Sequence, residues 1–239
     1  MNYLDLTLPT PAENLACDEA LLDRAETAGG PAVLRFWESP RPFVVLGYAN
    51  KVAEEVNVEA CRAAGVPILR RCSGGGTVLQ GPGCLNYSLV LRASDAGPHQ
   101  TITEANHFVM QRNRRTLEAL LGQPVSVEGI TDLAIGQLKF SGNAQRRKRD
   151  WFLFHGTFLL QFDFGLIEKL LLSPPRQPEY RRDRPHAEFL TQTKCSSTEL
   201  QAALRDAWAA SSTDDAALEA DIARLVSEKY GRNEWNLKW

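Results

Sequence analysis

The chain has 239 residues, of which 44% are hydrophobic and 23% are charged, and its formal net charge is -2. General nucleic-acid binding needs a basic excess and a membrane span needs about 20 apolar residues in a row, so this composition argues against both. We therefore expect one globular domain over residues 1–239, without a C-terminal accessory domain, and neither nucleic acid nor a membrane as its partner.

Cysteine and histidine usage indicates the compartment and the metal content. Five cysteines without a CxxC pair are typical of a reducing cytoplasm rather than of a disulfide framework. The N-terminus lacks a basic segment followed by an apolar one, so we expect no secretory signal and a cytoplasmic location. The four histidines, at 99, 107, 155 and 186, are too far apart for a metal-ligand motif.

Hydrophobic periodicity and turn residues predict the elements of the first half of the chain. In order they are a strand-like start over 1–10, a helix over 14–22, strands over 33–37 and 43–47, a helix over 52–64, a hairpin of strands 77–80 and 85–91, a polar loop over 93–100, and a helix over 103–121.

The second half of the chain is predicted in the same way. It contains a strand over 125–127, a hairpin of strands 130–135 and 138–141, a polar loop over 142–150, a strand over 151–160, a helix over 165–172, a proline-rich loop over 173–185, and helices over 197–211 and 215–230. This order predicts an α+β fold, with a mixed, mostly antiparallel sheet flanked by helices.

The segment 70–78 carries the strongest chemical signal. Two arginines, Arg70 and Arg71, precede the three glycines at 74–76. A glycine turn lets a ligand approach backbone N–H groups, and arginine adds forked donors, which together suit a phosphate or a carboxylate. A tight hairpin with a basic flank explains the three glycines equally well.

Lys139 and Asp132 lie on either side of a predicted hairpin turn. Since Leu138 and Phe140 are apolar and face the opposite way, Lys139 is placed to point into a cleft. Asp132 is then a candidate ligand for hydrated Mg²⁺. The alternatives are an edge-strand lysine and a cross-strand ion pair.

Two other features have simple structural explanations. His155 ends an aromatic strand, and a lone histidine is more often structural than catalytic. The basic run 146–149 is explained most simply as a solvated mobile loop, although it is also suited to close over an anionic ligand or to dock an acidic partner.

Three motifs taken together resemble the lipoate–protein ligase family, which belongs to the biotin and lipoate protein ligases. They are Arg70-Arg71-x-Ser73-Gly74-Gly75-Gly76-Thr77-Val78 with Gly83-x-Leu85-Asn86-Tyr87-Ser88, Asp132-Leu133 with Lys139-Phe140-Ser141-Gly142-Asn143-Ala144-Gln145, and His155-Gly156-Thr157. Residues 14–21 and Glu234-Trp235-Asn236 support the resemblance, which spans nearly the whole chain.

The resemblance implies a biotin/lipoate protein ligase-like catalytic domain. It would activate lipoate or octanoate with ATP and Mg²⁺ to acyl-AMP, with Lys139 at the reacting carboxyl–phosphate region. The residues implied for substrate and adenylate binding are Arg70, Arg71, Ser73, Gly74, Gly75, Gly76, Thr77, Asn86, Gly142, Asn143, Ala144, His155, Gly156 and Thr157.

The implied partners are lipoyl-carrier proteins, either E2 lipoyl domains or glycine-cleavage H-like proteins, and a lysine of the carrier accepts the acyl group. The rival within this fold is an octanoyltransferase, which passes the acyl group through a cysteine thioester without ATP. The chain has no cysteine in 123–129 or 172–176, the regions where the two transferase branches carry theirs. A non-catalytic lipoyl-binding homologue predicts loss of the lysine and the glycine turn, and both are retained.

The chain departs from the family pattern at two places. Gln80-Gly81 stands where the family usually has His-Asp, and residue 239 leaves no room for the small accessory domain that many ligases carry. We therefore expect a separate accessory subunit, a partial activity or a different acyl group.

Overall fold

A computed structural model describes residues 1–96, 101–212 and 218–239. Among these residues the strands are β1 (Asn2–Asp5), β2 (Val33–Trp37), β3 (Phe43–Leu46), β4 (Ile68–Arg70), β5 (Val78–Gln80), β6 (Cys84–Arg92), β7 (Ser126–Glu128), β8 (Asp132–Ile135), β9 (Leu138–Arg147), β10 (Trp151–Leu159) and β11 (Ser211–Ser212).

The same residues also form helices, which lie singly or in groups between and after these strands. They are α1 (Pro11–Ala28), α2 (Val52–Glu55), α3 (Val58–Ala63), α4 (Ile102–Leu121), α5 (Phe164–Leu170), α6 (His186–Phe189), α7 (Ser197–Ala207), α8 (Glu219–Leu225) and α9 (Asn233–Asn236), with single turns η1 (Ala93–Ala96), η2 (Glu179–Arg181) and η3 (Val226–Tyr230).

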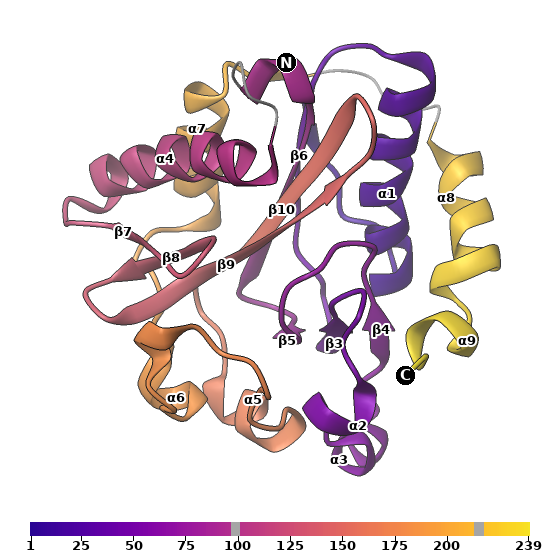
Figure 1. The fold of residues 1–239 in the computed structure, drawn as a ribbon, viewed down its shortest axis with the longest axis vertical. Coiled ribbons are helices and arrows are strands. Elements are labelled where there is room, and N and C mark those ends of the chain that lie inside the picture. Colours follow the sequence, from indigo (N-terminus) through magenta and orange to yellow (C-terminus); the bar gives the residue numbers. More distant parts are fainter. Residues whose placement is uncertain (97–100, 213–217) are drawn as a thin grey trace.

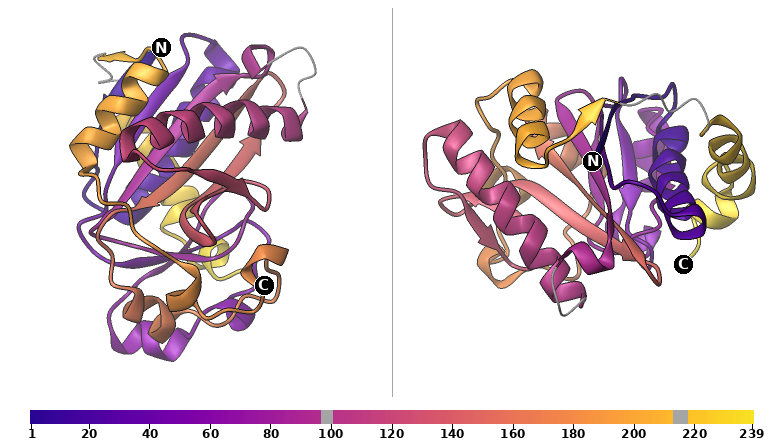
Figure 2. Two further views of the ribbon diagram at one scale, coloured as in Figure 1. Left: turned by 90° about the vertical axis from the view of Figure 1, so that its left-hand side faces the viewer. Right: turned by 90° about the horizontal axis from the view of Figure 1, so that it is seen from above.

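The strands form two sheets. The large sheet has the order β11-β1-β2-β6-β10-β9-β8-β7, and the small sheet has the order β4-β3-β5. In the large sheet β11, β1 and β2 pair in parallel, and every pairing from β2 to β7 is antiparallel. Helices α4 and α7 lie on one side of this sheet, and α1 and α8 lie on the other (Figures 1 and 2). The predicted α+β fold with mostly antiparallel sheets is confirmed.

Central strand β6 shows how the two faces of the large sheet are used. Leu89 and Leu91 pack into the cluster that contains α4 and α7, whereas Val90 packs into the cluster that contains α1. This alternation follows from the two-residue period of a strand. The sequence predicts a half-buried strand here, but residues 84–91 are all buried because both faces are covered.

Helix α1 begins three residues earlier than predicted. The Thr10 side chain caps the helix by accepting from the Glu13 N–H, and the Glu13 side chain accepts in turn from the Thr10 N–H. Pro11 occupies the first turn, where its missing N–H costs nothing. Proline therefore opens this helix, although the sequence pattern predicted that it would end a strand.

The predicted hairpin over 77–91 is wrong. Strand β5 pairs with β3 in the small sheet, whereas β6 pairs with β2 and β10 in the large one. The 81–83 turn therefore carries the chain from one sheet to the other. Gly83 has a φ of 84°, and a Cβ there would lie 1.9 Å from the carbonyl oxygen of Gln161.

The predicted loop over 142–150 is also wrong for most of its length. Strand β9 continues to Arg147, because β10 pairs with it from Ser141 to Arg147. Cation–π contacts place the guanidinium of Arg146 over the Tyr48 ring and that of Arg147 over the Phe152 ring. The basic run is thus half strand, and Gly142, Asn143 and Ala144 are strand residues.

Smaller differences concern the helices. The helix predicted over 52–64 is interrupted at Val56, which bridges to Leu171, and Asn57 then caps α3. Helix α6 was not predicted. Parts of the predicted loop 93–100 and of the predicted helix 215–230 lie outside the described residues. Within the part of the chain that the structure describes, no helix has the length and apolarity to cross a bilayer.

We expect Gly83→Ala to lower the free energy of unfolding by at least about 2 kcal/mol, because a side chain at positive φ is strained and its Cβ meets backbone. Gly122→Ala is the matched control, since Gly122 has a φ of 62° and a Cβ added there would have nothing within 4 Å. Urea denaturation measures both variants. Equal losses for the two would contradict the close packing at Gly83.

Candidate functional site

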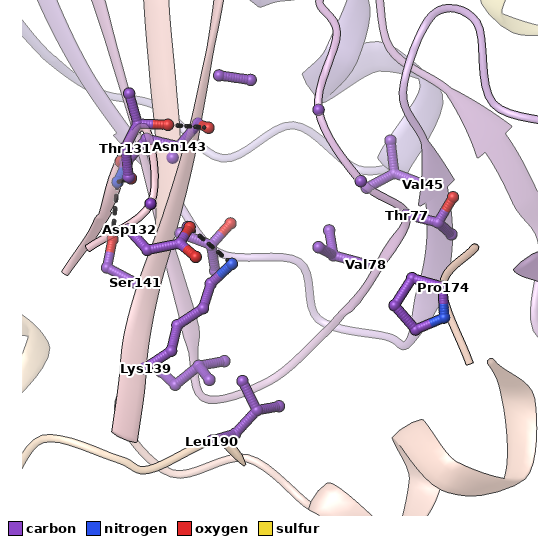
Figure 3. A pocket seen from close by; sticks show the side chains of 18 of the residues that line it. Val45, Thr77, Val78, Thr131, Asp132, Lys139, Ser141, Asn143, Pro174 and Leu190 are labelled. Carbon is purple, nitrogen blue, oxygen red and sulfur yellow. Dashed lines mark hydrogen bonds and ion pairs between the residues drawn. The ribbon is translucent and has the colours of Figure 1, made fainter. Parts of the chain in front are cut away.

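A cavity of about 800 Å³ opens between the two sheets, under the 173–185 segment. Lys139 and Asp132 lie on one wall, and Val45, Thr77 and Val78 face them across it (Figure 3). The sequence-predicted residues that line the cavity are Arg71, Gly75, Gly76, Thr77, Asn86, Asp132, Lys139, Gly142, Asn143, Ala144, His155, Gly156 and Thr157.

Arg70, Ser73 and Gly74 are the predicted site residues that do not line this cavity. Arg70 is fully buried behind the glycine turn, and its guanidinium donates to backbone carbonyls. Its Nη1 donates to the oxygens of Gly47 (2.8 Å) and Asn50 (2.7 Å), and its Nη2 donates to that of Lys238 (2.6 Å). Arg70 therefore ties the 47–50 turn to the C-terminal segment.

The same segment makes two more contacts with the backbone of Arg70. The Asn236 side chain accepts from the Arg70 N–H at 3.1 Å, and the Trp235 indole N–H donates to the Arg70 carbonyl at 2.8 Å. Burial lowers the pKa of Arg70, and the charge of Glu55 opposes this shift. The motif at 234–236 thus holds β4 in place at the start of the glycine turn.

Arg71 is the arginine that reaches the cavity. Its Nη2 donates to the carbonyls of Gly74 (2.6 Å) and Gly76 (2.8 Å), so the guanidinium holds the glycine turn closed. Burial lowers its pKa to about 10, which still leaves it charged at neutral pH. Among the three glycines, a positive φ is found at Gly75, and its carbonyl packs so closely on Gly47 that a Cβ on Gly47 would lie 2.1 Å from it.

Lys139 and Asp132 form an ion pair, with 2.8 Å between Nζ and Oδ1. The Tyr180 hydroxyl donates to the other carboxylate oxygen at 2.8 Å. Burial raises the pKa of Tyr180, as does the charge of Asp132, so the hydroxyl keeps its proton. A Cβ on Gly142 would lie 2.7 Å from the Lys139 Nζ, so glycine is needed for the ammonium to lie over the strand.

The cross-strand ion pair that the spacing left open is therefore present. No cluster of three or more metal-ligating side chains was found in residues 1–96, 101–212 and 218–239. Mg²⁺ at phosphate sites commonly takes one or two carboxylates and fills its remaining positions with phosphate and water oxygens. Asp132 fits that limited role and no larger one.

A second glycine is explained by its neighbour across the sheet. Asn143 and Gly156 are paired between β9 and β10, and a Cβ on Gly156 would lie 1.8 Å from the Asn143 side-chain oxygen. Asn143 also donates to the Thr131 carbonyl at 2.6 Å and accepts from the Tyr87 hydroxyl at 2.6 Å. Glycine at 156 leaves the space that this amide occupies.

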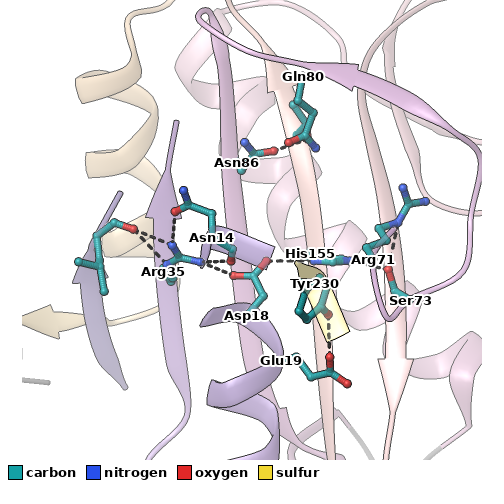
Figure 4. Close-up of polar contacts among 12 residues, drawn as sticks. Asn14, Asp18, Glu19, Arg35, Arg71, Ser73, Gln80, Asn86, His155 and Tyr230 are labelled. Atoms are coloured by element: carbon teal, nitrogen blue, oxygen red, sulfur yellow. Dashed lines mark hydrogen bonds and ion pairs between the residues drawn. The ribbon is translucent and has the colours of Figure 1, made fainter. Parts of the chain in front are cut away.

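Gln80 stands where the family pattern usually has histidine. Its Nε2 donates to the Thr157 hydroxyl at 2.9 Å, and that hydroxyl donates to the Asn86 side chain at 2.6 Å. The Thr157 hydroxyl thus connects Asn86 with Gln80, a residue that the sequence marked only as a departure. Gln80 and Asn86 are labelled in Figure 4.

His155 lies in a buried polar chain rather than alone. Its Nε2 is 2.6 Å from the Ser73 hydroxyl, and its Nδ1 is 3.2 Å from the Asp18 carboxylate. Asp18 in turn forms an ion pair with Arg35 at 2.7 Å (Figure 4). Burial alone would raise the pKa of Asp18, but the hydrogen bond from His155 and the charge of Arg35 hold it below its usual value.

Asp18 and Arg35 are polar residues of the site that were not predicted from the sequence. A charged residue inside the apolar run 33–37 was a usable signal, because a buried arginine needs a partner. The sequence also gave no sign that the 173–190 segment closes one side of the cavity. Tyr180 anchors this segment to Asp132, and its ring packs on Phe189 at a centroid distance of 5.1 Å.

No cysteine lies among the residues that line the cavity. Burial raises the pKa of Cys72 and of Cys84 to about 12, and it also raises that of Cys61. These thiols are therefore protonated at neutral pH. Cys195, which is partly exposed, lines a separate depression with Lys194.

Comparison with known proteins identifies relatives along the chain. Residues 10–207 match the family model of the lipoyl protein ligase A/B catalytic domain. A protein assigned as lipoate-protein ligase A in Aeropyrum pernix is 36% identical over 170 residues, which are 71% of this chain and 61% of that protein. Octanoyltransferase LipM of Geobacillus kaustophilus is 28% identical over 271 residues, covering 99% of this chain and 97% of the relative.

Solved structures share the fold. A bi-partite lipoate protein ligase from Thermoplasma acidophilum, studied with its E2 lipoyl domain, has a TM-score of 0.84 at 24% identity and covers 99% of this chain and 95% of its own. A lipoate-protein ligase A bound with ATP has a TM-score of 0.84 at 23% identity, over 99% of this chain and 98% of its own. A Thermoplasma acidophilum protein with bound lipoic acid has a TM-score of 0.83 at 23% identity, and the match covers 100% of this chain and 98% of that protein.

We expect Arg70→Met to lower the free energy of unfolding by at least about 3 kcal/mol, because it leaves buried carbonyls of the 47–50 turn and the C-terminal segment without donors. Arg62→Met is the control, since Arg62 is 71% exposed and its ion pair with Glu59 is worth little. Urea denaturation compares them. A loss at Arg70 as small as that at Arg62 would show that the guanidinium is not structural.

His186 lines the cavity, and burial lowers its pKa to about 4, helped by the charges of Arg181 and Lys139. Between pH 6.5 and 4 the unfolded chain therefore takes up a proton that the folded chain does not, so stability falls as the pH falls. Between pH 7 and pH 5 we expect the free energy of unfolding to fall by about 1–2 kcal/mol less in His186→Asn than in wild type. Parallel denaturant titrations of wild type and variant measure it; identical pH profiles would contradict the shift.

Proposed function

Because the chain belongs to the lipoyl protein ligase A/B catalytic-domain family, we propose that it is an ATP-dependent lipoate–protein ligase. In this proposal a single domain activates lipoate or octanoate to acyl-AMP and passes the acyl group to a lysine of a lipoyl-carrier domain. The observation that carries the proposal is the cavity itself, which combines the Lys139 ammonium, the Arg71-held glycine turn and apolar walls without a thiol.

The first step is attack of the acid's carboxylate oxygen on the α-phosphorus of ATP. A new O–P bond forms while the bond to the pyrophosphate oxygen breaks, and pyrophosphate leaves. Lys139 and Arg71 both line the cavity and carry positive charge, which stabilises the negative charge that develops on the phosphoryl oxygens. The side chains of Val45, Val78 and Leu159 supply an apolar surface for the acyl chain.

The second step is attack of the carrier lysine's amine on the carbonyl of the mixed anhydride. The amide bond forms, AMP leaves with the former acid oxygen, and the amine gives up a proton. The 173–185 segment lies over the cavity through the Tyr180–Asp132 contact, a position suited to shielding the anhydride from water.

Mg²⁺ would enter with the nucleotide. Asp132 would offer it one carboxylate oxygen, and the ion would supply charge neutralisation at the phosphates. Lys139 already forms an ion pair with that carboxylate. When the nucleotide and Mg²⁺ bind, either this ion pair would open or Asp132 would contact both the ammonium and the metal ion. The proposed carriers are E2 lipoyl domains or glycine-cleavage H-like proteins. The bi-partite relative suggests that a separate accessory subunit assists, and we place the protein in the cytoplasm.

A second candidate is an ATP-independent octanoyltransferase, and the LipM relatives favour it because they align with almost the whole chain. That reaction passes the acyl group through a thioester and needs a thiolate at the cavity. The cysteines of this chain do not line the cavity, and three of them have pKa values raised by burial. These observations support the ligase over the transferase.

We expect Lys139→Ala to slow acyl-AMP formation by about 100-fold or more, because it removes a preorganised donor at the developing charge. Pyrophosphate release with ATP, Mg²⁺ and lipoate or octanoate measures the step, and mass spectrometry of an added lipoyl domain measures transfer. Lys194→Ala is the control, since Lys194 is exposed and lies outside the cavity.

Normal rates in Lys139→Ala would remove Lys139 from the mechanism. If wild type forms no acyl-AMP, with or without the accessory subunit, the ligase proposal fails. Acyl transfer from an octanoylated carrier without ATP would then support the transferase, and Cys195→Ser would test whether the partly exposed thiol carries the acyl group.

A further inference from the structure

A buried chain of polar groups runs from the centre of the large sheet to the wall of the cavity. It links Arg35 to Asp18 (2.7 Å), Asp18 to His155 (3.2 Å), His155 to Ser73 (2.6 Å) and the Ser73 hydroxyl to the Nε of Arg71 (3.1 Å). Each of these five residues is at most 8% exposed. The chain therefore joins β2, α1, β10 and the glycine turn away from water.

The first end of the chain fixes its charge. The Arg35 guanidinium also donates to the Leu6 and Asn14 carbonyls and to the Asn14 side chain, so its donors are satisfied. Opposite this charge Asp18 is ionised, and a carboxylate can only accept hydrogen bonds. The proton on His155 must therefore lie on Nδ1.

The second end of the chain follows from that assignment. In the tautomer with its proton on Nδ1, the imidazole presents Nε2 as an acceptor, so the Ser73 hydroxyl donates to it. The Ser73 oxygen then has lone pairs for the Nε–H of Arg71. Every proton between Asp18 and Ser73 then has one place. The Arg71 Nε–H is shared between the Ser73 oxygen and the Gly74 carbonyl, each at 3.1 Å, so Ser73 adds a side-chain acceptor to the backbone carbonyls that hold the guanidinium.

We propose that Asp18 and Arg35 are positioning residues of the site, which act through the tautomer of His155 and the hydroxyl of Ser73 to set the orientation of Arg71. In the reaction of the proposed function, Arg71 then meets the anionic substrate without having to reorient. Preorganisation of this kind is where an enzyme gains charge stabilisation at no cost during the reaction.

The chain of polar groups has the spacing of a serine–histidine–aspartate triad, but its chemistry is different. Ser73 has no exposed surface and does not line the cavity, so its hydroxyl cannot reach an acyl carbonyl. The Arg71 Nε–H also occupies one side of the Ser73 oxygen. Ser73 is therefore a link in a positioning chain and not a nucleophile.

The first experiment reads the tautomer directly. Long-range ¹H–¹⁵N NMR of the wild-type protein distinguishes protonated from unprotonated ring nitrogens, and His155→Gln identifies the His155 signals among the four histidines. We expect a proton on Nδ1 and none on Nε2. Asp18→Asn should move the proton to Nε2, because an amide can donate to Nδ1. A wild-type proton on Nε2 overturns the proposal.

The second experiment reads the effect on Arg71. Ser73→Ala keeps Asp18 and the His155 tautomer but removes the link to Arg71. We expect it to weaken binding of a non-hydrolysable lipoyl-adenylate analogue by roughly 10-fold or more, measured by calorimetry. Ser39→Ala is the matched control, since Ser39 is equally buried and donates to the Arg41 carbonyl away from the cavity.

The two readouts separate this proposal from the proposed function on which its binding assay rests. If wild type does not bind the analogue, the ligase proposal fails, while the NMR result still decides the tautomer. Equal affinities of Ser73→Ala and Ser39→Ala overturn the positioning role. Ser73→Thr, which keeps a hydroxyl, should recover affinity if the hydrogen bond is the cause.

Discussion

The site depends on one constraint, which is that two buried guanidinium groups, those of Arg70 and Arg71, immediately precede the glycine turn. Isolated burial of a charge is costly, so each guanidinium must find acceptors. Arg70 finds them on carbonyls of the 47–50 turn and the C-terminal segment, and Arg71 finds them on carbonyls of the glycine turn. Arg71 therefore holds the glycine turn directly, and Arg70 holds the 47–50 turn, against which the Gly75 carbonyl packs at Gly47. Arg70 is itself held by Trp235 and Lys238, which lie 165 and 168 positions further along the chain.

The cavity results from the meeting of two sheets rather than from a single motif. Strands β9 and β10 bring Lys139, Asn143 and His155 to one wall, and β3 and β5 bring an apolar wall opposite. The 81–83 turn makes this arrangement because it sends consecutive strands into different sheets. Polar and apolar walls on either side of one space suit a substrate with a charged head and an aliphatic chain.

Glycine has two separate uses in the site. Gly75 takes a positive φ, which a turn with close backbone approach requires. Gly142 and Gly156 are ordinary strand residues whose missing Cβ makes room for the Lys139 ammonium and the Asn143 amide. The small residues that follow Lys139 were interpreted from the sequence as a loop, whereas in the structure they form a strand on which polar side chains lie flat.

The sequence by itself predicted the α+β class and most helices and strands, because these follow from local periodicity. It also predicted thirteen of the residues that line the cavity, most of them through the resemblance of its motifs to a known family. Only the tertiary structure decided that β5 and β6 belong to different sheets and that β9 extends to Arg147. It also decided that Arg70 binds backbone carbonyls while Arg71 lines the cavity. It also brought Asp18 and Arg35 to His155. Strand pairing and the partners of buried charges depend on residues distant in sequence. The arginine inside the apolar run 33–37 indicated that a partner was needed, but no local pattern showed which residue it was.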